Sequence, residues 1–264
     1  MQQSIRMLGA LLASAALATL GGVAHAAVQG SSHDLSGQTT NTSEVCVFCH
    51  TPHGSNVGFQ GAPLWNKVTD ATGFQRYSTL NTSTLDGAEA PVGSVSLACL
   101  SCHDGTQAMD VVVNVPGSGG WNPLGTEIDG TAIGPISGIG PIPNLTKDLR
   151  DDHPISIQYA GGGCSSADPA CTTLGDPDFN LPATAAINTV QQWWVDTGAV
   201  GTREKTDIIL YSRNEATVAG GLQPFVECAS CHDPHNQESS GTGEVQFLRV
   251  SNAGSSICLA CHNK

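Results

Sequence analysis

The 264-residue sequence predicts a mostly irregular, loop-rich fold with short helices and few short strands. Three observations lead to this prediction. Glycine (31 residues) and proline (14 residues) are frequent, and both interrupt regular elements. Aromatic residues make up only 5% of the chain. The apolar residues seldom keep a helical or a strand period. We therefore expect bound groups, rather than packed side chains, to supply much of the buried surface.

The first 26 residues have the organisation of a secretory signal peptide. Arg6 gives a charged start, residues 7–20 are apolar, and residues 24–26 form a small-x-small cleavage site. The apolar run is short for a membrane span, and no later run is long enough for one. We expect cleavage after Ala26 and an exported chain without a membrane span.

The motif C-x-x-C-H occurs four times, whereas only about 0.01 copies are expected by chance from the composition. Two thiols at this spacing can form thioethers to the vinyl groups of one porphyrin, and the adjacent histidine then binds the iron. Zinc sites or redox disulfides are the alternative, but neither explains a histidine after every pair. The motifs predict four covalently attached haem c groups, at Cys46, Cys49 and His50, at Cys99, Cys102 and His103, at Cys228, Cys231 and His232, and at Cys258, Cys261 and His262.

Four further histidines follow the signal peptide, and each haem iron needs a sixth ligand. They are His33, His53, His153 and His235. Any single one of them is compatible with an ordinary surface residue, but the matched count favours bis-histidine ligation of all four irons. A bis-histidine iron is coordinatively full, so it transfers electrons but does not readily bind a substrate. We therefore expect an electron-transfer protein and no enzyme.

The ligand residues occur in the same order in both parts of the chain. His33 precedes CVFCHTPH (residues 46–53) and then CLSCH, while His153 precedes CASCHDPH (residues 228–235) and then CLACH. This order indicates a duplicated dihaem module. The predicted organisation is one continuous haem-organised unit with a first half at 27–150 and a second half at 151–264.

His53 and His235 each follow a proximal histidine by three positions. Three extended residues span roughly 10 Å, and a segment that includes Pro52 cannot pass around the porphyrin edge to the opposite face. Both histidines are therefore predicted to bind a neighbouring haem. His33 and His153 are expected to act within their own halves, and which haem each one serves stays open.

Regular structure is expected only in short pieces. Short helices should surround each haem motif. Residues 184–195 are predicted as a helix, and residues 207–211 and 245–250 as short strands. Residues 111–150, rich in glycine, proline and isoleucine, are predicted to form a long loop that wraps around the haem chain.

Some residues remain outside the ligand assignment. Cys164 and Cys171 are disulfide candidates, because the exported chain meets an oxidising compartment; two free thiols are the alternative. Met109 is close in sequence to His103 and is expected to pack rather than to bind iron. Four tryptophans are expected to pack against haem or in the core: Trp65, Trp121, Trp193 and Trp194.

The ligand pattern resembles that of the tetrahaem extracellular cytochrome nanowires, among the doubled-CXXCH-motif multihaem cytochromes. The resemblance rests on CVFCHTPH (46–53), DHPIS (152–156) and four bis-histidine sets. It implies a loop-rich fold around a continuous haem chain and a filament that carries electrons to extracellular acceptors such as metal oxides. In that family one axial histidine comes from the adjoining subunit. His53 is the matching candidate here, and His33 is the second.

Two other functions stay open at this point. One is a monomeric periplasmic shuttle that delivers electrons to a reductase, and the other is a haem reductase with one open iron. The partners expected are identical subunits of a filament, redox partner proteins or extracellular electron acceptors. The formal net charge of −13 argues against nucleic acid as a partner.

Overall fold

The computed structural model describes residues 28–39, 42–115, 134–138, 143–236 and 247–263. The predicted signal peptide, Trp121 and much of the predicted wrapping loop lie outside these residues. In the part of the chain described, no helix is long and apolar enough to cross a membrane.

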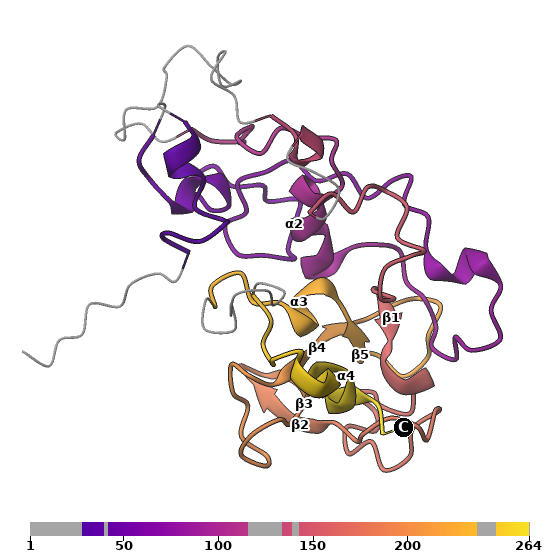
Figure 1. Ribbon diagram of the computed structural model, residues 1–264. Helices are drawn as coiled ribbons and strands as arrows, with labels where there is room; N and C mark the ends of the chain where they lie inside the picture. Colours follow the sequence, from indigo (N-terminus) through magenta and orange to yellow (C-terminus); the bar gives the residue numbers. More distant parts are fainter. Residues whose placement is uncertain (1–27, 40–41, 116–133, 139–142, 237–246, 264) are drawn as a thin grey trace, which may run out of the picture.

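A five-stranded antiparallel sheet corrects the predicted fold class of a mostly irregular chain wrapped around haems. The strands lie in the order β1-β5-β4-β3-β2, and they form the lower part of the molecule in Figure 1. All neighbouring strands are antiparallel. The strands are β1 (Ile157–Gln158), β2 (Ala183–Ile187), β3 (Val190–Val195), β4 (Ile208–Arg213) and β5 (Gln223–Val226).

The hairpin of β2 and β3 replaces the helix predicted for residues 184–195. Asn188 and Thr189 have φ values of 50° and 67°, and two-residue turns of type I′ need a positive φ at both central positions. The second strand reads VQQWWV, and β-branched and aromatic residues suit a pleated surface. Trp193 pairs with Leu210 of β4. This pairing joins two separate segments, so the residue pattern of residues 184–195 alone could not predict it.

The two short strands predicted from sequence have different outcomes. The prediction for residues 207–211 is confirmed, because β4 covers most of that segment. The prediction for residues 245–250 is wrong over the part described. From residue 247 onward this segment forms a single bridge, between Leu248 and His232, and no strand.

Side chains form a core of their own, contrary to the expectation that bound groups would have to supply it. Aromatic residues are few, but several in the sheet region are almost completely buried. Trp193 and Phe225 are 0% exposed, and Tyr159 is 1% exposed. Two smaller apolar clusters lie in the first half, one around Phe48 and Met109 and one around Leu97, Leu100 and Leu149.

Short helices occur at every haem motif, as predicted. Hydrogen bonds from each proximal histidine N–H to the first cysteine carbonyl close the motif turn at His50 (2.8 Å), His232 (3.1 Å) and His262 (2.9 Å). The helices at the motifs are the 3-10 helix η2 (Cys46–Phe48), α2 (Ser94–His103), α3 (Cys228–Cys231) and α4 (Ser256–Cys261). The other 3-10 helices are η1 (Leu35–Gln38), η3 (Tyr77–Leu80), η4 (Ile136–Gly138), η5 (Tyr159–Gly161) and η6 (Ala253–Ser255).

The two predicted halves are hydrogen-bonded to each other. Ala90 N–H donates to the Ser156 carbonyl (2.8 Å), and Gln158 N–H donates to the Ala88 carbonyl (2.9 Å), so a first-half segment runs along β1. Helices α2 and α3 also contact each other, where the upper and lower parts meet in Figure 1. A haem motif of the first half is thereby placed against a haem motif of the second.

Candidate haem-binding sites

The backbone around two of the haem motifs repeats as the ligand residues do. His50 forms an antiparallel bridge with Trp65, and His232 forms one with Leu248. In both cases the residue before the bridge partner is left-handed, with φ values of 53° at Leu64 and 64° at Phe247. A non-glycine residue rarely adopts this conformation. The duplicated pattern of the sequence therefore extends to the local backbone.

Two proximal histidines are oriented by proline carbonyls. The Nδ1 atom of His50 lies 2.7 Å from the Pro63 carbonyl oxygen, and that of His103 lies 2.6 Å from the Pro143 oxygen. A ring nitrogen that faces a carbonyl carries the proton, which leaves Nε2 with the lone pair that a metal needs. The sequence prediction missed both prolines. A proline followed two positions later by an apolar residue, Trp65 or Leu145, is the feature that the two segments share.

The structure brings two spare histidines opposite two proximal ones. The ring centroids of His50 and His235 are 6.2 Å apart, with an interplanar angle of 21°. The centroids of His33 and His103 are also 6.2 Å apart, with an angle of 84°. One pair joins the first and third motif segments, and the other lies within the first half.

This spacing fits two imidazoles on opposite faces of one iron. A metal–nitrogen bond of about 2 Å and a ring centroid about 1 Å behind the nitrogen place two such centroids roughly 6 Å apart. Rotation about the metal–nitrogen axis leaves that distance unchanged, so both interplanar angles are compatible with axial ligation. The residues present therefore fit a bis-histidine haem at each of these two pairs.

His33 is held in the form that binds a metal. Its ring stacks on Phe247, with centroids 4.4 Å apart. Its pKa is lowered to about 4, mainly by desolvation and then by the charge of the facing His103. The imidazole is consequently neutral near pH 7, as metal ligation requires.

Asp233 orients His235. Its carboxylate accepts from the His235 backbone N–H at 3.0 Å and lies 3.6 Å from His235 Nδ1. The nearby His235 side chain is the main cause that lowers the pKa of Asp233 to about 2, and the His235 backbone N–H and the Arg249 guanidinium contribute. A carboxylate near Nδ1 favours the tautomer in which the other ring nitrogen can bind a metal.

The two remaining spare histidines have different surroundings. Both are exposed. The Nδ1 atom of His153 lies 3.0 Å from the Pro154 carbonyl oxygen, and the pKa of His153 is lowered mainly by desolvation and in smaller part by the His262 charge. The His53 carbonyl accepts hydrogen bonds from Thr51 Oγ1 (2.8 Å) and Asn114 Nδ2 (2.6 Å). The His53 ring has no hydrogen-bond or ring partner among the described residues.

The motif cysteines lie next to one another in the order of the sequence. Cys49 and Cys102 share an apolar cluster. The thiols of Cys99 and Cys228 shift each other's pKa, upward at Cys99 and downward at Cys228. Burial raises the pKa of Cys231 to about 11, and the nearby Cys258 contributes. The four C-x-x-C-H motifs therefore form a series from the first motif to the last.

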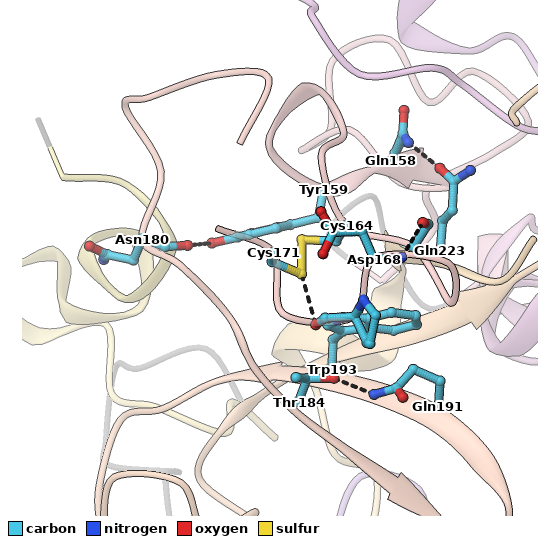
Figure 2. The surroundings of a disulfide bond; sticks show 12 residues. Gln158, Tyr159, Cys164, Asp168, Cys171, Asn180, Thr184, Gln191, Trp193 and Gln223 are labelled. Carbon is cyan, nitrogen blue, oxygen red and sulfur yellow. Dashed lines mark hydrogen bonds between the residues drawn. A yellow bond between two sulfur atoms is a disulfide. The ribbon is translucent and has the colours of Figure 1, made fainter. Parts of the chain in front are cut away.

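The ten cysteines fall into two groups. All eight motif cysteines are free thiols, whereas Cys164 and Cys171 form a disulfide. The disulfide lies beside Trp193, whose Nε1 donates to the Pro169 carbonyl at 3.4 Å. Figure 2 shows these side chains together with Tyr159, which belongs to the same cluster. The disulfide is thus part of the sheet core.

Residues expected to pack do so where the structure describes them. Met109 is buried in the cluster that contains Cys49 and Cys102, so the packing prediction is confirmed. Trp193 and Trp194 are buried in the sheet. Trp65 lies edge-on to His50, with centroids 5.7 Å apart.

Neither comparison with known proteins assigns a family, because no family model and no curated protein matches the chain. Among the described residues, no group of three or more His, Cys, Asp or Glu side chains is arranged to hold a metal ion. A haem iron takes only two protein ligands, so that observation concerns sites for free ions.

Proposed function

We propose that this protein is an exported tetrahaem c-type cytochrome that carries electrons along four bis-histidine haems. We further propose that it polymerises into an extracellular filament and delivers electrons to extracellular acceptors. One observation carries the proposal. Four C-x-x-C-H motifs occur in a chain where two spare histidines lie 6.2 Å, centroid to centroid, from two motif histidines.

The side chains around each site have separable tasks. Haem bound at these sites would supply a one-electron Fe(III)/Fe(II) couple. The cysteines anchor the porphyrin covalently, and the Pro63 and Pro143 carbonyls hold the tautomers of His50 and His103. Buried side chains such as Phe48 and Met109 exclude water from the first two attachment sites. The adjacency of successive motifs supports transfer from one site to the next.

The position of His53 supports assembly with a second copy of the chain. The reach argument excludes its own haem. His33 and His235 face motif histidines of the same chain, and the His262 charge acts on His153. This count leaves His53 for a motif of the His232 type, and we propose that this motif belongs to the adjoining copy.

The test begins with protein matured in cells that attach haem c. Mass spectrometry should show four haems, and the visible spectrum should be that of low-spin bis-histidine iron. Electron microscopy should then show filaments. Fewer than four attached haems would overturn the cytochrome assignment itself.

His53→Ala is the variant that tests assembly. It should retain four haems but form no filaments, because the iron of the adjoining copy loses a ligand. Filaments that persist in this variant would contradict the bridging role. Wild-type protein that stays monomeric with four low-spin haems would instead support the periplasmic shuttle. A high-spin haem in the assembled state would support the reductase.

A further inference from the structure

Lys67 is a completely buried cation in the first half of the molecule. Its exposed fraction is 0%. Lysine is almost never fully buried without a partner, because transfer of its charge out of water is costly. Its Nζ atom donates to the Met109 carbonyl (2.7 Å) and to the Val111 carbonyl (2.8 Å). The ammonium is thus held in place by two backbone dipoles.

Lys67 lies beside the first two haem attachment sites. The preceding residue, Asn66, donates its backbone N–H to the Cys49 carbonyl (2.8 Å), and its side chain donates to the Val47 carbonyl (2.7 Å). Met109, which binds the ammonium, belongs to the cluster that includes Cys49 and Cys102. The Lys67 ammonium is therefore connected to the cluster of Cys49 and Cys102 in two ways, through Asn66 and through Met109.

The thiols of both motifs sense the charge. Burial is the main cause that raises the pKa of Cys49 and of Cys102, and the Lys67 charge opposes that rise at both. The influence of Lys67 therefore extends to both attachment sites.

No carboxylate is ion-paired with Lys67 in the part of the chain described. Asp110 is also buried, but the two form no ion pair. The buried charge near the second and third motifs is different. Glu227 precedes Cys228 and is 2.8 Å from the Arg213 guanidinium, so its field is largely cancelled. The buried Asp104 carboxylate acts on Cys102 with the opposite sign, but it is not ion-paired with Lys67, whereas the charge at the next junction is directly paired.

We infer that Lys67 raises the reduction potential of the haems attached at the first two motifs. This inference rests on the proposed function. Reduction of Fe(III) to Fe(II) adds one electron to the site, and a fixed positive charge stabilises the added negative charge. Charge and burial around a haem are among the means by which a protein sets its potential. Lys67 would then give the conduit a higher-potential end at its first two haems.

The test is a redox titration of purified holoprotein, followed in the visible spectrum. Lys67→Met and Lys67→Gln remove the charge, whereas Lys67→Arg keeps it. The neutral variants should shift the midpoint potential of at least one haem downward, and the arginine variant should stay closer to the wild type. Lys147→Met is the matched control, because Lys147 is a partly exposed lysine paired with Asp70; it should leave the potentials unchanged.

Two outcomes separate this inference from the proposed function. Neutral variants with four haems and unchanged potentials would overturn the role of Lys67 and leave the cytochrome assignment standing. If neither neutral variant folds, the inference is tested in protein that keeps Lys67 but lacks one haem attachment site. The highest-potential component should vanish when Cys46 and Cys49, or Cys99 and Cys102, are replaced. Its survival in both deletions would refute the inference.

Discussion

The two C-x-x-C-H-x-Pro-His segments are alike in sequence, but the structure holds their last histidines differently. His235 faces His50 and is oriented by the Asp233 carboxylate. Thr51 stands at the equivalent position of the first segment, and its hydroxyl donates to the His53 carbonyl instead of holding the ring. His53 and His235 are both exposed, but only His235 has a ring partner among the described residues. A single position of the repeat, acidic in one copy and neutral in the other, thus accompanies one histidine that faces a motif histidine and one that does not.

The halves that contain these segments also differ in how they are stabilised. The second half has a sheet whose core combines Trp193, Leu210 and a disulfide. The first half has two smaller clusters, and motif cysteines line one of them, while Cys261 packs against the sheet core. Duplicated motif residues therefore do not require duplicated scaffolds, because the motifs themselves need only local turns. What surrounds those turns is free to differ.

The largest effect is expected when haem is withheld from the chain. The sheet region should keep its amide protection because side chains form its core, whereas residues 42–115 should open. We expect protection to differ by about a hundredfold between them, or roughly 3 kcal/mol of opening free energy. Hydrogen–deuterium exchange of the haem-free chain measures this difference. Equal amide protection in both regions would contradict the idea that the two halves are stabilised differently.

The next effect separates the two outer histidines. In dispersed subunits, His235→Ala should convert one further haem to the high-spin form, because the iron of His50 loses its distal ligand. His53→Ala should add no high-spin haem in dispersed subunits, because the iron that His53 is proposed to bind belongs to another copy of the chain. Binding of carbon monoxide, followed in the visible spectrum, counts the open irons. An additional open iron in dispersed His53→Ala subunits would show that His53 binds within its own chain.

A smaller effect tests the sheet core. Trp193→Ala should lower the free energy of unfolding by about 3–5 kcal/mol, as is typical when a buried aromatic side chain is removed. Val190→Ala, at a partly exposed position of the same strand, should cost no more than about 0.5 kcal/mol. Urea unfolding followed by circular dichroism compares the two variants. Similar losses in both would mean that Trp193 is not a central core residue.

The smallest effect concerns the group that orients His235. Asp233→Asn removes the carboxylate from Nδ1, and loss of such a partner weakens a metal ligand about tenfold, or roughly 1.4 kcal/mol. Imidazole should then displace His235 at about tenfold lower concentration. Asp148→Asn, at a carboxylate that pairs with Arg150, provides the control. An unchanged displacement curve for Asp233→Asn would argue that backbone contacts alone hold the ring.

Several structural features were predictable because their causes are local. The haem motifs and their short turns follow from spacing within five residues, and β4 follows from a run of apolar β-formers. The hairpin of residues 183–195 was not predictable in this way. Its tryptophans are compatible with a helix until β4 lies beside them, so the neighbouring strand decided the outcome. The orienting prolines were missed because Pro63 and Pro143 lie far along the chain from the histidines they hold.

The sequence by itself determines the covalent chemistry this chain can support. Four cysteine pairs with an adjacent histidine, four spare histidines and two further cysteines are properties of residue order. Only the tertiary structure decided which histidines face each other, that Lys67 is buried beside two motifs, and that a sheet stabilises the second half. The physical reason is that burial and cross-chain distance depend on contacts between segments that are far apart in sequence. Local spacing cannot encode them.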